Sequence, residues 1–407
     1  MKKLLSILCA AVLLATLVIT CVSCGGSSVS ADFKVGAILI GDENEGYTYA
    51  HINGIRTAAK ELGMSDDQII WKYTVPEDEK CYDAAIDLVE QGCSVIFSNS
   101  YGHQSHMKQA AQECPDVTFV AMTGDQAATS GLSNYKNAFT GVYQSRYVAG
   151  VVAGMKLAEL VADGKLTDAN YDGDNIKLGY VGAYPYAEVV SGFTAYYLGV
   201  KSVVENVTMQ VTYTNSWFDI TAEGTVAEAL AADGCVIISE HADSTGAPAA
   251  VQALQDKGQV IYCVGYNVDM LSVAPNAALT SPTNTWAVYY KYAMETAANG
   301  GTIDTNWAKG YEADAVGITA LGSACAAGTQ EKVDEVVKGL KDGSINVFDN
   351  SKFTVGGATL TEYLADVDGD FAPDTNAIWD GYFHESEMRS APYFDIRIDG
   401  IVENNNN

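Results

Sequence analysis

Residues 177–214, KLGYVGAYPYAEVVSGFTAYYLGVKSVVENVTMQVTYT, contain the repeating unit that decides the fold class. KLGYVGA (177–183) is a short apolar run of strand-favouring residues, EVVSGFTAYYLGVKSV (188–203) has a helical pattern, and MQVTYT (209–214) is a second strand run. Strands that alternate with helices in this way form a parallel sheet with helices on both faces. The stretch therefore predicts an α/β fold.

The same unit recurs in two series along the chain. The expected strands are 34–40, 69–74, 94–100, 117–124 and 138–143 in the first series, and 177–183, 209–214, 235–241 and 260–267 in the second. Two such series predict two doubly wound parallel-sheet lobes around a hinge, with crossings near residues 143–145 and 281–283. Because open parallel sheets bind ligands beyond the carboxyl ends of their strands, the turns there should face one ligand cleft.

The expected organisation has five parts. They are a lipoprotein signal peptide (1–23), a flexible tether (24–32), an N-terminal lobe (33–143 plus 283–345), a C-terminal lobe (144–282) and a C-terminal appendage (346–407). The appendage has an irregular pattern, which suggests antiparallel edge strands and loops.

The first residues indicate export. A basic start, MKK, precedes an apolar run that is short for a spanning helix, which is typical of a signal peptide. CVSCGGSS (21–28) comes next and resembles the lipobox of bacterial lipoproteins, so Cys24 is the expected lipidation site on the extracytoplasmic face of the cell membrane. The alternatives are a plain secretory signal and cleavage before Cys21.

The composition excludes some partners and cofactors. The chain of 407 residues has a net charge of −28, which argues against nucleic acid as a partner. The cysteines beyond the leader are scattered, so neither zinc nor a disulfide scaffold is indicated, and Cys235 and Cys263 are expected to be buried thiols. The Asp-rich stretches DANYDGDNIKLG (168–179) and DVDGD (366–370) depart from a calcium loop, and turn chemistry explains them more simply. No metal or cofactor is expected.

Aromatic and hydrogen-bonding side chains recur in the turns that should face the cleft. The candidate ligand-binding residues are Tyr47, Thr48, Tyr101, Tyr186, Trp217, Asp219, Asp243, Tyr266 and Asp269. Rings stack on flat ligands, and carboxylates accept hydrogen bonds from amino groups, ring N–H groups or ribose hydroxyls. Two structural interpretations remain open. Trp217 would then pack into the hydrophobic seam below its turn, and Asp219 would cap the next helix.

These motifs together resemble the basic membrane protein family, the PnrA-like lipoproteins that bind substrates for ABC importers. The resemblance rests on VSCGG, GYTYAHINGI, FSNSYGH, VTFVAMTG, YVGAYPYAEVVSGFTAYYLG, NSWFD, EHADSTG and GYNVDM, and covers roughly residues 33–301. It implies a type I periplasmic-binding-protein fold and a purine base or nucleoside as ligand. Trp217 and Asp269 match family positions, whereas Tyr47 stands where many relatives have Trp. The spacing of GDENEGY (41–47) differs from the ribose-contacting stretch of nucleoside binders, so a bare base is also compatible.

The resemblance implies a monomeric binding protein that hands a purine to an ABC transporter permease. A sensor or carrier for another flat or sugar-like ligand, such as a flavin or a sugar signal, is the alternative within this fold. An extracellular nucleosidase is the alternative of another class. It would need an acid/base pair or a metal in the cleft, and the sequence shows no such constellation, so an enzyme is not expected.

Overall fold

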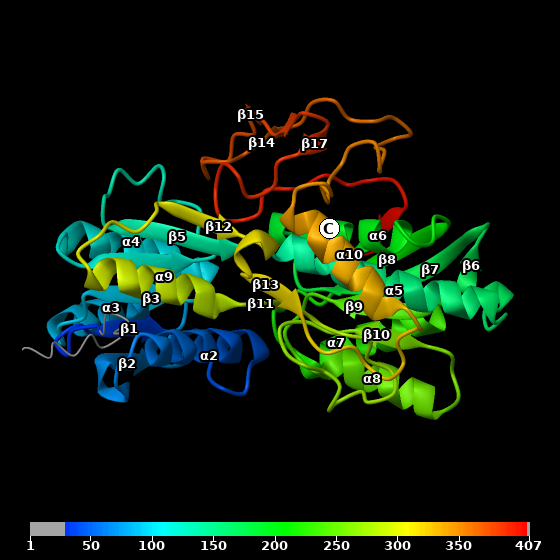
Figure 1. The fold of residues 1–407 in the computed structure, drawn as a ribbon, viewed down its shortest axis with the longest axis horizontal. Helices are drawn as coiled ribbons and strands as arrows, with labels where there is room; N and C mark the ends of the chain where they lie inside the picture. The colour runs from blue at the N-terminus through cyan, green and yellow to red at the C-terminus, as the bar shows by residue number, and fades with distance from the viewer. Residues whose placement is uncertain (1–28, 405–407) are drawn as a thin grey trace, which may run out of the picture.

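The computed structural model describes residues 29–404, which form two α/β lobes with an additional C-terminal segment above both (Figure 1). The signal peptide, most of the tether and Cys24 lie outside the described residues. Within the described range no helix combines the length and apolar character that a bilayer crossing requires.

The first lobe is built on a parallel sheet with the strand order β12-β5-β4-β3-β1-β2. Its strands are β1 (Val35–Ile38), β2 (Ile69–Lys72), β3 (Val95–Ser98), β4 (Thr118–Met122), β5 (Tyr135–Thr140) and β12 (Asn306–Lys309). The predicted strands 34–40, 69–74, 94–100 and 117–124 are confirmed. The strand predicted at 138–143 begins earlier, because Val142 already opens the next helix, and β12 was not predicted.

Two helical layers cover this sheet, one on each face. They are α2 (Gly46–Glu61) with α9 (Trp286–Ala298), and α3 (Glu79–Glu90) with α4 (Gln104–Glu113). Each pair has its own apolar core against the strands, which is why β1 and β3 are buried along their whole length.

The second lobe repeats this plan around the order β10-β9-β7-β8-β18. Its strands are β6 (Tyr171–Asp172), β7 (Asn175–Gly182), β8 (Val207–Tyr213), β9 (Ile237–Glu240), β10 (Tyr262–Val264) and β18 (Ile401–Glu403). Its helices are α5 (Val142–Ala162), α6 (Ala187–Lys201), α7 (Ile220–Ala232), α8 (Gly246–Asp256) and α10 (Thr329–Lys341). All four strands predicted for this lobe are confirmed, and Cys235 and Cys263 are buried beside them as expected.

Helices α5 and α6 touch backbone to backbone, and two glycines make this possible. A Cβ on Gly150 would overlap the carbonyl oxygen of Tyr196, and one on Gly199 would overlap that of Tyr147. Any larger residue at either position would push the helices apart, so this pair of glycines sets their spacing.

The chain crosses between the lobes at β5–α5, at β11 (Pro282–Asn284) and at β13 (Val316–Ile318), and β11 pairs antiparallel with β13. The crossing through β13 was not predicted. As a result, the expected boundary of the N-terminal lobe at residue 345 is wrong for α10. That helix packs its Val333, Val336 and Leu340 into the core of the second lobe.

The appendage, residues 346–400, leaves α10 and lies over both lobes (orange to red in Figure 1). It contains the short antiparallel pairs β14 (Leu364–Ala365) with β15 (Thr375–Asn376), and β16 (Ile378–Trp379) with β17 (Tyr382–Phe383). The expectation of an antiparallel appendage is wrong at its end, because β18 joins the second sheet parallel to β8. Strand β18 is therefore part of the second lobe.

Candidate functional site

The candidate site lies where the two lobes meet at the carboxyl ends of their sheets. A hollow of about 250 Å³ is lined from the first lobe by Glu43, Asn44, Gly46 and Tyr49, and from the second by Phe218, Ile220, Asp243, Ser244, Thr245, Val268 and Met270. A Cβ on Gly46 would come within 3.3 Å of the carbonyl oxygen of Asp243. The lobes therefore touch, and this is a closed arrangement of the hinge.

The start of helix α2 forms the wall of the first lobe. Glu45 caps the helix, accepting hydrogen bonds from the backbone N–H of Tyr47 at 2.8 Å and of Thr48 at 2.9 Å. The Tyr47 hydroxyl donates to the carbonyl of Asn99 at 2.5 Å, and the Asn99 amide donates to the Thr48 hydroxyl at 3.1 Å. His51 supports the Tyr47 ring edge-on at 4.5 Å. The Tyr47 ring is thus held rigidly at the lobe boundary.

A buried arginine anchors the wall of the second lobe. Arg146, near the start of α5, is fully buried and places its guanidinium 3.7 Å from the centroid of the Tyr266 ring. Its Nη1 donates to the carbonyl of Glu240 at 2.5 Å. Within residues 29–404, its Nε and Nη2 have no hydrogen-bond partner. Two donors of a buried cation are therefore free to meet an acceptor of a ligand.

Carboxylates of the second lobe lie near this arginine, and Glu188 and Asp243 also lie near Tyr47 of the first lobe. Burial raises the pKa of Glu188 to about 7, although the Arg146 charge opposes this. Burial also raises the pKa of Asp243 well above its ordinary value, and the negative charges of Glu45 and Glu188 add to the effect. Like charges that converge in a buried place favour either a proton or a ligand that donates hydrogen bonds. The site is thus an acceptor-rich one.

A chain of amides connects Asp243 to the hinge. The Asn267 amide donates to Asp243 at 2.8 Å, and the Asn284 amide donates to the side-chain oxygen of Asn267 at 3.0 Å. Asn284 lies on β11 and accepts from Thr140 at the end of β5, so the network touches two of the three crossings. Asn267 has a left-handed backbone (φ 60), which asparagine tolerates. Asp243 is therefore positioned by the same elements that bend when the lobes move.

The structure brings some of the sequence-predicted residues together. Tyr47, Asp243 and Tyr266 meet around Arg146 and Glu188, and Thr48 holds Asn99 beneath Tyr47. Trp217 joins an aromatic cluster at the rim of the second lobe, 5.4 Å from Tyr184, which stacks on Tyr186 at 5.1 Å. The Trp217 carbonyl accepts from the Asp243 backbone N–H at 2.7 Å. This ring cluster therefore borders the site.

Three other predicted residues make contacts elsewhere. The Asp219 carboxylate accepts from the Ala222 N–H and caps α7, which is the simpler reading left open by the sequence. Asp269 is exposed and its carboxylate accepts from the Leu271 N–H in a local turn. The Tyr101 hydroxyl donates to Asp125 at 3.0 Å, on the side of the first lobe that faces the appendage.

Sequence reasoning missed several residues of the site, namely Glu45, Arg146, Glu188, Asn267 and Asn284. Arg146 directly follows the first predicted crossing in a chain with few basic residues, and this position was the available signal. Glu188 stands in AYPYAE, from which only the tyrosines were singled out. The partners of these residues come from distant segments, so no local pattern reveals them.

The fold and this site define a two-lobed, hinged ligand-binding protein. The family model described as ABC transporter substrate-binding protein, PnrA-like, matches residues 40–350. The chain therefore belongs to the PnrA-like family of substrate-binding proteins of ABC transporters, as the sequence motifs indicated. This family is one of transporter components rather than of enzymes.

Individual relatives carry different ligand names. A purine-binding protein of Brucella abortus (strain 2308) is 32% identical over 267 residues, which is 65% of this chain and 69% of that protein. A protein of Haloferax volcanii named as a glucose-binding component of an ABC transporter is 27% identical, over 68% of this chain and 64% of that protein. A solved solute-binding protein of an ABC transporter from Aeropyrum pernix K1 has a TM-score of 0.63 at 15% identity, covering 80% of this chain and 94% of that one. The solved structure supports the fold.

Proposed function

We propose that this protein binds a purine, as a base or a nucleoside, between its lobes and delivers it to an ABC importer. The observation that carries the proposal is the acceptor-rich, ring-lined boundary at which Glu45 and Tyr47 of the first lobe meet Glu188, Asp243 and Tyr266 of the second. The purine-binding relative from Brucella abortus supports the choice of ligand.

The chemistry of the boundary suits a flat heterocycle with N–H donors. The rings of Tyr47 and Tyr266 offer stacking faces, and the rim ring of Trp217 offers another. Asp243 and Glu188 accept from amino or ring N–H groups, while the free N–H groups of Arg146 donate to a ring nitrogen or carbonyl oxygen. Tyr47 remains a neutral phenol, because burial and the neighbouring Glu188 raise its pKa well above its usual range. The boundary thus offers acceptors for the N–H groups of a purine and donors for its ring nitrogen or carbonyl oxygen.

Delivery depends on the hinge and on the expected N-terminal anchor. In the proposal the lobes close over the purine, the permease recognises the closed form, and a lipid on Cys24 keeps the protein at the extracytoplasmic face of the membrane. The protein acts as a monomer and needs no cofactor.

A sugar-like ligand is the second candidate, and the glucose-binding name of the Haloferax volcanii relative is the observation in its favour. Sugars also stack on rings, accept hydrogen bonds from arginine and donate them to carboxylates. The acidic residues at the boundary favour the purine, since its ring N–H and amino groups match the acceptors Glu188 and Asp243 and its flat faces match the rings of Tyr47 and Tyr266.

The first test is a thermal-shift screen of the mature protein with adenine, guanine, hypoxanthine, their nucleosides, riboflavin and glucose, followed by calorimetry. A ligand that binds the folded form raises the free energy of unfolding by RT ln(1 + [L]/Kd), and the melting temperature rises with it. Stabilisation by a purine supports the proposal, and a response to glucose or riboflavin alone would overturn the choice of ligand. Incubation with inosine tests the enzyme alternative, because release of hypoxanthine would contradict a pure binding protein.

A further inference from the structure

We infer that the appendage, residues 346–400, is an interlobe strap. It is anchored in the second lobe and rests on the cleft edge of the first lobe through a small polar foot, so the lobes separate only when the foot releases. The foot is the loop 366–371 together with Arg389 and Ser390. This inference concerns the hinge and does not depend on which ligand is bound.

The anchor is large and apolar. Phe348, Phe353, Phe383 and Phe394 pack into the same core as α5, α6 and the second sheet. Phe348 and Phe394 stack at 4.1 Å, and β18 then continues the sheet beside β8. An element buried in this way moves with its lobe, because exposing its rings would cost apolar burial.

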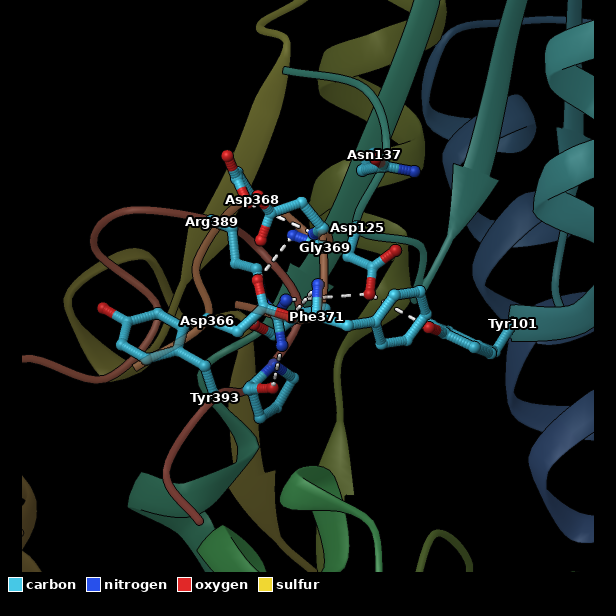
Figure 2. A network of polar contacts seen from close by, with 12 residues as sticks. Tyr101, Asp125, Asn137, Asp366, Asp368, Gly369, Phe371, Arg389 and Tyr393 are labelled. Carbon is cyan, nitrogen blue, oxygen red and sulfur yellow. Dashed lines mark hydrogen bonds and ion pairs between the residues drawn. The ribbon is translucent and has the colours of Figure 1, made fainter. Parts of the chain in front are cut away.

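The foot meets the first lobe through a few polar contacts. Arg389 Nη1 lies 3.7 Å from Asp125 Oδ2, the Thr129 hydroxyl donates to the carbonyl of Asp368 at 3.3 Å, and the Ser390 hydroxyl donates to Asn306 at 3.4 Å. Figure 2 shows Tyr101 reaching the Asp125 carboxylate from the first lobe, with the appendage loop of Asp366, Asp368 and Gly369 next to it. These contacts are far weaker than the anchor, so the foot is the end that releases.

The position of the foot makes it sensitive to opening. Tyr101 follows β3 and Asp125 follows β4, so both lie at the carboxyl ends of the first sheet, on the side that the appendage covers rather than beside the hollow lined by Gly46 and Asp243. The strap therefore bridges the two lobes on one side of the cleft. A hinge motion that separates these edges stretches the contacts of the foot and leaves the anchor intact.

The foot is shaped in advance by its own aspartates. Asp366 accepts from the backbone N–H of Gly369 at 2.8 Å and of Phe371 at 3.1 Å. Gly369 has a left-handed backbone (φ 75) and packs against Asp125, where an added Cβ would lie 3.4 Å from the carboxylate. A rigid loop loses little conformational entropy on docking, which favours repeated release and return.

The strap leaves room above the hinge beside its foot. A hollow of about 500 Å³ lies between residues 385–390 of the strap, which include Arg389 and Ser390 of the foot, and the first crossing and β12, where its lining includes Gly141, Gln144 and Gly310. Loose contact at this point lets the crossings bend without unpacking the strap. The strength of the foot contacts, rather than packing at the hinge, then determines how strongly the appendage stabilises the closed form.

The effect of the strap can be described by an equilibrium between an open and a closed form of the two lobes. Contacts that exist only in the closed form raise its population and slow its opening, and they do so with or without a ligand. A weakened foot should therefore open the ligand-free protein and hasten release of any ligand held between the lobes.

The test uses the mature protein and a foot variant, Asp125→Asn with Thr129→Val and Ser390→Ala. A matched control, Asp349→Asn with Ser351→Ala, removes similar polar contacts inside the appendage, where Asp349 accepts from Ser351 at 2.7 Å. Small-angle scattering of the ligand-free proteins should give a larger radius of gyration for the foot variant only. Adenine, used as the probe, should dissociate several-fold faster from it than from the control.

An unchanged radius and an unchanged dissociation rate in a folded foot variant would overturn the strap. If adenine does not bind, the choice of adenine as ligand is wrong, but the radius of gyration of the ligand-free proteins still tests the strap. A second variant, Thr129→Cys with Asp368→Cys, covers the case in which the foot variant does not fold. Oxidation of that pair should slow adenine association and reduction should restore it, and equal rates in both states would contradict the inference.

Discussion

Three aspartates in the turns of the second lobe, all candidate ligand-binding residues, have different surroundings. Asp219 after β8 and Asp269 after β10 each accept from a backbone N–H two or three residues further on. Asp243 after β9 instead accepts from the side chain of Asn267 and lies against the first lobe at Gly46. A carboxylate that binds its own backbone is occupied locally, whereas one held by a distant side chain is available across the cleft.

The difference has a physical origin in the segment that connects each strand to the next helix. Helix α7 begins at Ile220, so Asp219 satisfies orphan backbone donors at its start. Helix α8 begins at Gly246, and there the Ser244 hydroxyl donates to Glu223 and accepts from the Gly246 N–H. Ser244 therefore satisfies the local groups, and Asp243 is left for the cleft.

The largest expected effect is that of Asp243→Asn on purine binding. Asn can still accept from Asn267, so the fold should persist, while loss of the charged acceptor should weaken binding by about 2–3 kcal/mol. Isothermal calorimetry measures this directly. Asp269→Asn is the matched control and should leave affinity unchanged. An equal loss of affinity in both variants would contradict the conclusion that Asp243, and not Asp269, faces the ligand.

Trp217→Ala tests the aromatic rim beside Asp243. Loss of one stacking face should weaken purine binding by about 1–3 kcal/mol without unfolding the protein. The control is Trp379→Ala, which removes a partly exposed ring from the appendage. Native affinity in a folded Trp217 variant would assign this ring to packing against Tyr184 alone.

Stability against pH tests the buried carboxylates. Because the pKa of Glu188 in the folded protein is raised to about 7, the folded state retains a proton that the unfolded chain loses near 4.5. The resulting stabilisation, on the order of 2 kcal/mol, is complete below pH 4.5 and is lost as pH rises through 7. Denaturant midpoints between pH 4.5 and 8 should fall less steeply for Glu188→Gln than for the native protein. Parallel slopes would show that Glu188 titrates normally.

The smallest effect is expected at Asp219. Asp219→Ala removes the cap of α7 and should cost about 1 kcal/mol of unfolding free energy. Urea denaturation measures this loss, and purine affinity should stay the same. A large loss of affinity with unchanged stability would place Asp219 in the site after all.

Regular alternation made most of the strands predictable, including the edge strands β2 and β10, but the opposite edge of each sheet was not. Strands β12 and β18 are short and come from segments far from the strands they pair with, so their local patterns are weak. The crossing through β13 was not predicted for the same reason, because this strand is also short and has a weak local pattern. The aromatic candidates were visible because a ring in a strand-end turn is unusual, whereas Arg146 sits in a helix start that looks ordinary.

The sequence by itself determined the α/β class, the two lobes, the family and the turns from which a site could be built. Those features depend on local periodicity and on short motifs, which a linear chain displays directly. Only the tertiary structure decided which turn carboxylates face the cleft, that Arg146 is the cation among them, and that the C-terminal segment bridges both lobes. Each of these depends on contacts between residues far apart in the chain, and such contacts are set by packing.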